Sequence, residues 1–297
     1  MSATCWIVFH SDLTSGLTAI GNFSISYADD FISCATNAVT LQRGLNFIEN
    51  WCQSWEISLA ANKCFLAEYG PGPHADVTLS GVPVARLDGN YFKSLGVVLD
   101  LEQTFSPHAK AIIAKAKSVS ATILRCFHSK DIHLLFAAFQ TYVIPHLEYA
   151  SCVWNSISPR DSDAIESVLI DFTRRIFRRA RMSTLNYAER LKFLDTISLR
   201  ARREATDLSF AHAVISGEHF CPVIQPAPLP PRASSRLAPR AIHNPHASRQ
   251  AQRMPHNRVS KAYNALPARM RTMRLDTFRS ASRHYCSFPK DSRRDIF

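Results

Sequence analysis

The chain has 297 residues, of which 46% are hydrophobic and 20% charged, with a formal net charge of +11. This composition is typical of a globular protein with room for two modest cores. No apolar stretch approaches the roughly 20 residues of a membrane-spanning helix, and the N-terminus lacks the basic segment of a signal peptide. The eight cysteines form no Cys-x-x-Cys pair, so we expect an intracellular protein, in the nucleus or the cytoplasm, with reduced thiols.

The first predicted element is a hairpin around the tetrapeptide Tyr27-Ala28-Asp29-Asp30. Residues 23–27 alternate between apolar and polar side chains, as a half-buried strand does, and residues 31–34 are compatible with a second strand. Two adjacent carboxylates at a hairpin tip repel each other, so they need either exposure to water or a hard cation such as Mg²⁺. The pattern alone fits a polar turn as well as a metal site.

Up to residue 100 the pattern predicts mixed helix and strand. Asn37 is a candidate cap for a helix whose apolar side chains recur at helical spacing. Short alternating or apolar runs predict strands at 55–59, 64–69, 77–79, 82–84 and 91–100. The fold class is therefore α+β, with an antiparallel sheet and a helix in this part.

From about residue 106 the pattern becomes helical. Helical spacing predicts helices at 107–128, 131–144, 161–181 and 186–215, and a helical bundle is the economical architecture. The third helix sets an apolar seam against four arginines: Arg174, Arg175, Arg178 and Arg179.

Charge is distributed unevenly along the chain. Residues 1–170 contain 10 basic and 15 acidic residues, whereas residues 171–297 contain 25 basic and 9 acidic residues. Such polarity is the expected electrostatic signature of a nucleic-acid partner for the C-terminal half, although a solvated basic surface would also produce it.

The C-terminal part begins with a proline-rich stretch. Residues 221–250 are predicted to form an extended linker, because a segment so rich in proline cannot form a packed core. Residues 251–297 are predicted to form a basic C-terminal tail with a few helical turns.

Taken in order, these segments resemble the reverse transcriptase of non-LTR (LINE-type, jockey-like) retrotransposons, from the middle of the palm to the C-terminus. The tetrapeptide 27–30 is similar to that family's third polymerase motif, Asn62-Lys63 to the fourth, and Phe92-Lys93-Ser94-Leu95-Gly96-Val97 to the fifth, or primer grip. Four helical stretches also resemble the thumb and C-terminal part of the family: 142–154, 165–175, 187–208 and 258–278. The resemblance implies a partial palm over residues 1–105 and a helical thumb-like domain over residues 106–220.

The resemblance implies RNA-directed DNA polymerase activity through two Mg²⁺ (or Mn²⁺) ions. Asp29 would be the principal metal ligand and Asp30 a supporting one, with Tyr27 packed beneath the turn. Lys63 would place a cation near the departing pyrophosphate, as a candidate proton donor or as an ordinary surface lysine. The primer terminus would be held by Phe92, Lys93, Leu95 and Gly96. The four arginines would contact the backbone of an RNA template and DNA primer hybrid, with a deoxynucleotide as the only small molecule.

One expected part of the family's palm has no counterpart in this sequence. The family has a further metal-binding aspartate well upstream of the hairpin, but only 26 residues precede Tyr27, and Asp12 is the sole carboxylate among them. We therefore interpret the chain as N-terminally truncated relative to the family. Because catalysis depends steeply on positioning, we expect no polymerisation by this chain alone. The alternatives are a non-catalytic nucleic-acid-binding remnant of the retrotransposon protein and a relic without a selected role.

Overall fold

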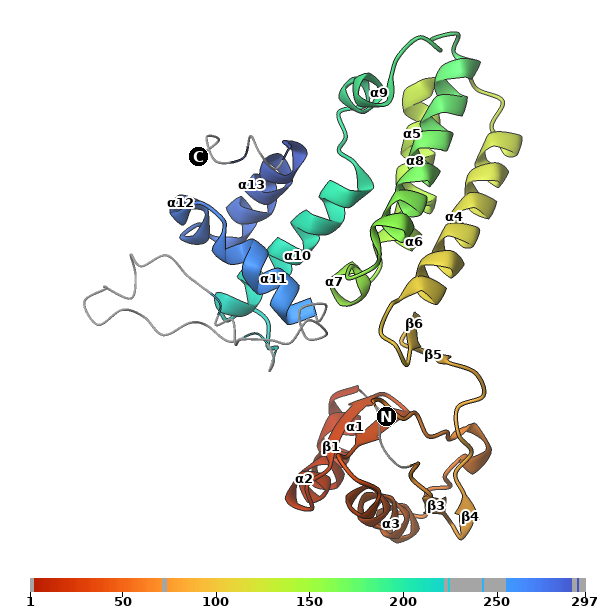
Figure 1. Cartoon of the computed structure of the whole chain (residues 1–297), viewed down its shortest axis with the longest axis vertical. Coiled ribbons are helices and arrows are strands. Elements are labelled where there is room, and N and C mark those ends of the chain that lie inside the picture. The colour runs from red at the N-terminus through yellow and green to blue at the C-terminus, as the bar shows by residue number, and fades with distance from the viewer. Residues whose placement is uncertain are drawn as a thin grey trace, which may run out of the picture. The chain divides into compact units, whose positions relative to one another are not determined.

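The computed structural model describes residues 3–70, 74–221, 224, 242, 255–289 and 293, and the chain divides into two compact units, residues 1–92 and 93–297 (Figure 1). Helices dominate both units, and the strands of the described residues pair into two-stranded sheets. The prediction of an α+β fold is confirmed at this level. Each unit is described by itself below.

The first unit is built around two helices and a hairpin. Helices α2 and α3 bury Leu13, Leu17, Ile48 and Trp51 in a small core. Strands β1 and β2 form an antiparallel hairpin, and β3 and β4 form a second, shorter one. The elements are α1 (Ala3–Phe9), α2 (Ser11–Ala19), β1 (Phe23–Tyr27), β2 (Asp30–Cys34), α3 (Ala38–Ser54), the 3₁₀ turn η1 (Ala61–Lys63), β3 (Thr78–Leu79) and β4 (Val82–Pro83).

The start of α3 follows from its sequence. The Asn37 side chain accepts a hydrogen bond from the Thr40 N–H at 2.8 Å, which satisfies one of the unpaired donors of the first turn. The helix ends at Ser54, where Trp55 leaves the helix and Glu56 takes a positive φ of 54°. The predicted cap is confirmed.

Two predicted strands are absent from the structure. Residues 55–59 form the turn after α3 and an extended stretch without strand pairing, and in 64–69 the described pairing is an isolated bridge from Leu66 to Arg86. Alternation over five residues predicts a strand only where a neighbouring strand completes the hydrogen bonds. The predicted strand at 91–100 is in fact a hairpin, which turns at Leu95-Gly96.

The second unit begins within this hairpin, at Lys93, and contains β6 and a large helical assembly. The helices from α4 through α9 share one core, in which Phe139, Trp154, Phe172 and Ile176 are fully buried or nearly so. Helix α4 packs on α8, and α5 packs on α4, α6 and α8. The elements are β5 (Tyr91–Ser94), β6 (Val97–Asp100), α4 (Ser106–Cys126), α5 (Ile132–Tyr142), α6 (Ile144–Glu148), α7 (Ser151–Trp154), α8 (Pro159–Arg179), α9 (Tyr187–Phe193) and α10 (Leu199–Ile215).

The predicted helix at 186–215 consists of two helices. A capping box joins Asn186 and Glu189 at the start of α9, which ends before Asp195, a residue with a positive φ of 47°. Ser198 then caps α10 by accepting a hydrogen bond from the Ala201 N–H at 3.1 Å. Two capping signals within one periodic stretch are what separate the helices.

The C-terminal helices pack on α10 and share a second core with it. This core includes Leu208, Tyr263, Met270 and Phe278. His212 links the parts: its ring stacks on Phe278 with centroids 4.0 Å apart and hydrogen-bonds both the Tyr263 hydroxyl and the Met273 carbonyl. The helices are α11 (Pro255–Asn264), α12 (Ala268–Arg271) and α13 (Leu275–Ser287).

Two further predictions concern the proline-rich linker and the absence of a membrane-spanning helix. Apart from residues 221, 224 and 242, the predicted linker 221–250 lies outside the described residues. Across the described helices, none combines the length and the apolar character needed to cross a bilayer.

Candidate metal and nucleic-acid sites

The paired aspartates lie at the tight turn of the first hairpin. Tyr27 and Asp30 are the last paired residues, so Ala28 and Asp29 form a two-residue turn. Ala28 has a positive φ of 52°, and its carbonyl accepts a hydrogen bond from the Trp6 indole N–H at 2.6 Å. Both carboxylates are exposed to solvent. The hairpin thus presents two adjacent sets of carboxylate oxygens on a turn that α1 supports.

The hairpin exposes the apolar face of β1. Phe23, Ile25 and Tyr27 lie on one face and are half or more exposed, and Ile32 is their cross-strand neighbour. Tyr27 is 64% exposed, so the expected packing beneath the turn is wrong. The period-two pattern correctly identified the strand. The face of the hairpin that packs on the core of this unit is the opposite one, which carries Phe31.

Lys63 is not paired with the aspartates. It is the exposed last residue of η1, within the same compact unit, and the structure gives it no hydrogen bond or ion pair with Asp29 or Asp30. Among the described residues, no group of three or more histidine, cysteine, aspartate or glutamate side chains is arranged to hold a metal ion. The hairpin therefore offers two carboxylates without a further protein ligand from the part of the chain described.

The expected primer-grip residues lie in β5 and in the strained turn that joins β5 to β6. Leu95 and Gly96 have φ of 46° and 83°, the two positive values that a type I′ hairpin turn requires. Tyr149 supports this turn, because its hydroxyl donates to the Leu95 carbonyl at 2.9 Å. Phe92 packs its ring on Phe65, with centroids 5.2 Å apart, whereas Lys93 is exposed.

Tyr149 is a supporting residue that sequence reasoning did not single out. A Cβ added to Gly96 would lie 3.1 Å from its ring, so the turn and the ring are in close contact. The only sequence signal was its place in the thumb-like stretch at 142–154, 54 positions beyond Leu95.

The conformation of Leu95 is costly, and this gives a first prediction. A branched side chain with positive φ is unfavourable by about 1–2 kcal/mol, and asparagine adopts this region with less strain. We expect Leu95→Asn to raise the free energy of unfolding of residues 93–297 by about 1 kcal/mol. Urea unfolding followed by circular dichroism measures this. Leu134→Asn, an exposed leucine inside α5, is the matched control and is expected not to stabilise; equal effects would contradict the strain.

The four arginines of α8 that were predicted to bind nucleic acid fall into two groups. Arg175 and Arg178 are exposed, and Arg174 is exposed but paired with Asp171, its Nη2 lying 2.6 Å from Oδ1. Arg179 differs from expectation: it donates to the carbonyls of Leu124 and Phe127, at 2.8 and 2.6 Å, and so caps the end of α4. Those two donors are committed to the fold, which leaves the other three arginines as phosphate-binding candidates.

A buried polar network lies elsewhere in the same unit, between α7, α10 and α11. Asp207 accepts hydrogen bonds from Asn155 at 2.7 Å and from Arg258 at 3.1 Å. Arg203 is fully buried, donates to Asn155 and Ser162, and lies over the Trp154 ring. Burial raises the pKa of Asp207 to about 6 despite these arginines. This network supports the fold rather than a surface site.

Comparison with known proteins gives little further guidance. No family model matches the chain, and no solved structure matches it. An uncharacterized protein of Caenorhabditis elegans is 29% identical to it over 133 residues, which is 45% of this chain and 67% of that protein.

Proposed function

We propose that this chain works in RNA-directed DNA synthesis, as the hairpin-bearing part of the palm and the thumb of a non-LTR retrotransposon reverse transcriptase. The observation that carries the proposal is the position of two exposed aspartates, with Asp29 in a two-residue hairpin turn and Asp30 next to it at the start of β2. The strained turn at Leu95 supports it, because bulky residues held in unfavourable backbone conformations cluster at functional sites.

The chemistry of the aspartate pair suits Mg²⁺ or Mn²⁺. Magnesium is usually held by one or two carboxylates and completes its shell with water and phosphate oxygens, which matches what the hairpin offers. Asp29 and Asp30 would hold such ions, which would supply Lewis-acid activation of the primer hydroxyl and stabilisation of charge on the transferring phosphoryl group. Asp29 and Asp30 would orient the ions, and the exposed Lys63 would provide a cation for the leaving pyrophosphate. A complete site needs a further carboxylate beyond these two.

Metal binding tests the proposal directly. We expect the Asp29→Asn/Asp30→Asn double variant to bind Mn²⁺ at least about tenfold more weakly, since even the loss of outer-shell partners weakens metal sites by that factor. Relaxation of water protons during Mn²⁺ titration measures the affinity. The matched control is Asp76→Asn/Asp88→Asn, which removes the same charge from exposed aspartates of the same unit. Equal losses in both double variants would refute a specific site.

Primer extension on an RNA template separates the catalytic from the non-catalytic form of the proposal. Because two carboxylates of one hairpin do not complete the site, we expect no incorporation by this chain alone. Incorporation that Asp29→Asn abolishes would contradict that expectation.

The second candidate function is nucleic-acid binding without catalysis. It is favoured by three exposed arginines of α8 in the second unit (residues 93–297, the helical unit): Arg174, Arg175 and Arg178. Phosphate contacts of this kind act without reading the base sequence. Salt-dependent binding of an RNA–DNA hybrid that persists in the Asp29→Asn variant would support it, and no binding at low salt would end it.

A further inference from the structure

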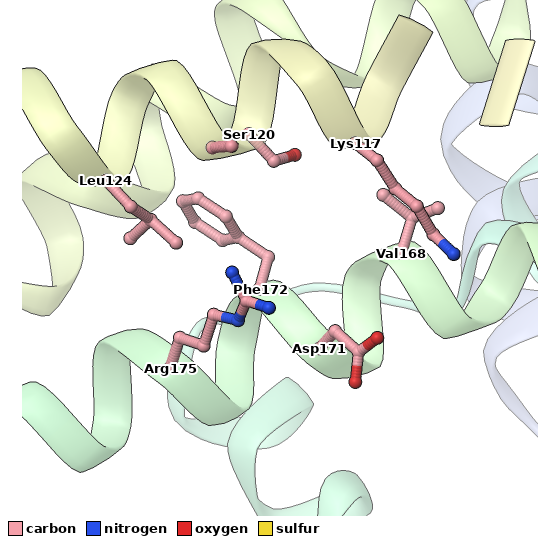
Figure 2. Close-up of a pocket in the computed structure, with 8 residues that line it drawn as sticks. Lys117, Ser120, Leu124, Val168, Asp171, Phe172 and Arg175 are labelled. Carbon is pink, nitrogen blue, oxygen red and sulfur yellow. The ribbon is translucent and has the colours of Figure 1, made fainter. Parts of the chain in front are cut away.

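A groove between α4 and α8 combines buried and charged polar groups. It has a volume of about 260 Å³ and is lined by Lys117 and Ser120 of α4 and by Asp171, Phe172 and Arg175 of α8 (Figure 2). Figure 2 shows Lys117 and Ser120 extending from α4 toward α8, while Phe172 and Arg175 rise toward α4. Both helices belong to the same compact unit and pack directly on each other.

The Ser120 hydroxyl is the unusual member of this groove. Its side chain is buried, with 8% of the residue exposed, and within the described structure its Oγ has no hydrogen-bond partner. Buried hydroxyls almost always have a partner, and an orphan calls for an explanation such as a ligand that supplies one. Because Oγ points into the space between α4 and α8, a ligand in the groove can accept its hydrogen bond.

The charges around this hydroxyl favour an anion. Lys117 and Arg175 are exposed at the groove, and the structure gives neither of them an ion-pair partner among the residues it describes. Asp171, the acidic member, is already engaged by Arg174 outside the groove lining. Phe172, Leu124 and Val168 give the groove an apolar wall beside these two cations.

We propose that this groove holds one backbone phosphate of a nucleic-acid strand. A hydroxyl donor together with an ammonium and a guanidinium is the donor set typical of phosphate recognition. The inference rests on the proposed function in that the ligand is a phosphodiester of the RNA–DNA hybrid. It adds that the contact lies between two helices and involves Lys117 and Ser120, which belong to α4 rather than to the arginine-bearing helix.

Binding of a fluorescent RNA–DNA hybrid by the full chain, measured by anisotropy between 50 and 300 mM salt, tests the proposal. The logarithm of the binding constant falls linearly with the logarithm of the salt concentration, with a slope of about 0.9 for each phosphate that the protein neutralises. If Lys117 and Arg175 share one phosphate, the Lys117→Gln/Arg175→Gln double variant loses about 0.9 in slope. If the two side chains contacted two separate phosphates, the slope would fall by about twice that amount, which would overturn the single shared phosphate site.

The neutral variant Ser120→Ala gives an independent readout. We expect about a threefold to tenfold loss of hybrid affinity with an unchanged salt slope, because a hydroxyl releases no counterion. Its thermal stability without ligand should be equal to or above that of the wild type, since an orphan hydroxyl is removed. Unchanged hybrid affinity in Ser120→Ala would refute the proposed phosphate site in the groove. The control is Lys115→Gln, an exposed lysine of α4 two positions from Lys117 and outside the groove lining.

Two further outcomes distinguish the possible failures. If inorganic phosphate raises the melting temperature of the wild type but not of Ser120→Ala, while hybrid affinity is the same in both, the groove binds free phosphate and the nucleic-acid assignment is wrong. If the wild type binds no hybrid at low salt, the proposed function itself fails. Wild-type binding that none of the groove variants alters refutes this inference alone.

Discussion

Replacing Asp207 by alanine is expected to lower the free energy of unfolding of the helical unit by about 3–5 kcal/mol, the usual effect of removing one partner from a buried ion pair. Asp207 is the buried acid that faces Arg203 and Arg258. Arg203 Nη1 and two nitrogens of Arg258 already lack acceptors within the described structure, so no spare oxygen can replace the lost carboxylate. Urea unfolding at pH 7.5, above the Asp207 pKa of about 6, measures the change.

The matched control removes an aspartate from an exposed ion pair of the same unit. Asp163 lies 2.8 Å from Arg200 with most of its side chain exposed, so Asp163→Ala is expected to change stability by no more than about 1 kcal/mol. A similarly small effect of Asp207→Ala would show that the buried network contributes little. The ion pair between Arg258 and Asp207 would then not be what holds α11 against α10.

Local signals in the sequence predicted local structure well. The Asn37 side chain caps α3 as expected, and the tetrapeptide at 27–30 forms the expected turn. On α8 the apolar seam predicted from spacing is buried, including Ile165 and Phe172. These features depend on residues a few positions apart, so a single stretch of sequence contains all the information required.

The features that sequence reasoning did not anticipate depend on distant contacts. Arg179 caps α4 through the carbonyl of Phe127, 52 positions earlier, and Tyr149 supports the turn at Leu95, 54 positions earlier. Nothing in the neighbouring residues distinguishes an arginine used in this way from one that faces solvent. The exposure of Tyr27 has the same origin, since a strand pattern does not state which face will be covered.

The candidate sites also divide into features that local sequence predicts and features that depend on distant contacts. Sequence reasoning identified the aspartate pair and the segment 92–97, but it predicted a continuous strand there and missed the turn at Leu95. The groove between α4 and α8 became visible only when Ser120 and Arg175 were placed together. These residues are far apart in sequence and lie on helices whose charged residues also fit ordinary solvated surfaces. Only burial of the hydroxyl separates the two interpretations.

Acidification below about pH 6.5 is expected to destabilise the helical unit through His108, whose pKa is lowered by burial. His108 is 2% exposed and accepts a hydrogen bond from the Val98 N–H at Nδ1, at 3.2 Å. Protonation of Nδ1 would remove that acceptor and create a buried charge. The unfolded chain therefore binds the proton more readily than the folded one. The stabilisation is complete above pH 6.5 and is lost as the pH falls below that value.

Urea unfolding between pH 7.5 and pH 5 tests this expectation. For a single proton, the pH dependence from His108 cannot exceed about 1.4 kcal/mol per pH unit. We expect His108→Asn, which keeps an acceptor but cannot be protonated, to show a shallower loss of stability toward low pH than the wild type. His128→Gln, at an exposed histidine of the same unit, should leave the wild-type curve unchanged. Parallel curves for wild type and His108→Asn would assign the acid sensitivity to other groups, and the contact between β6 and α4 would then be insensitive to protonation.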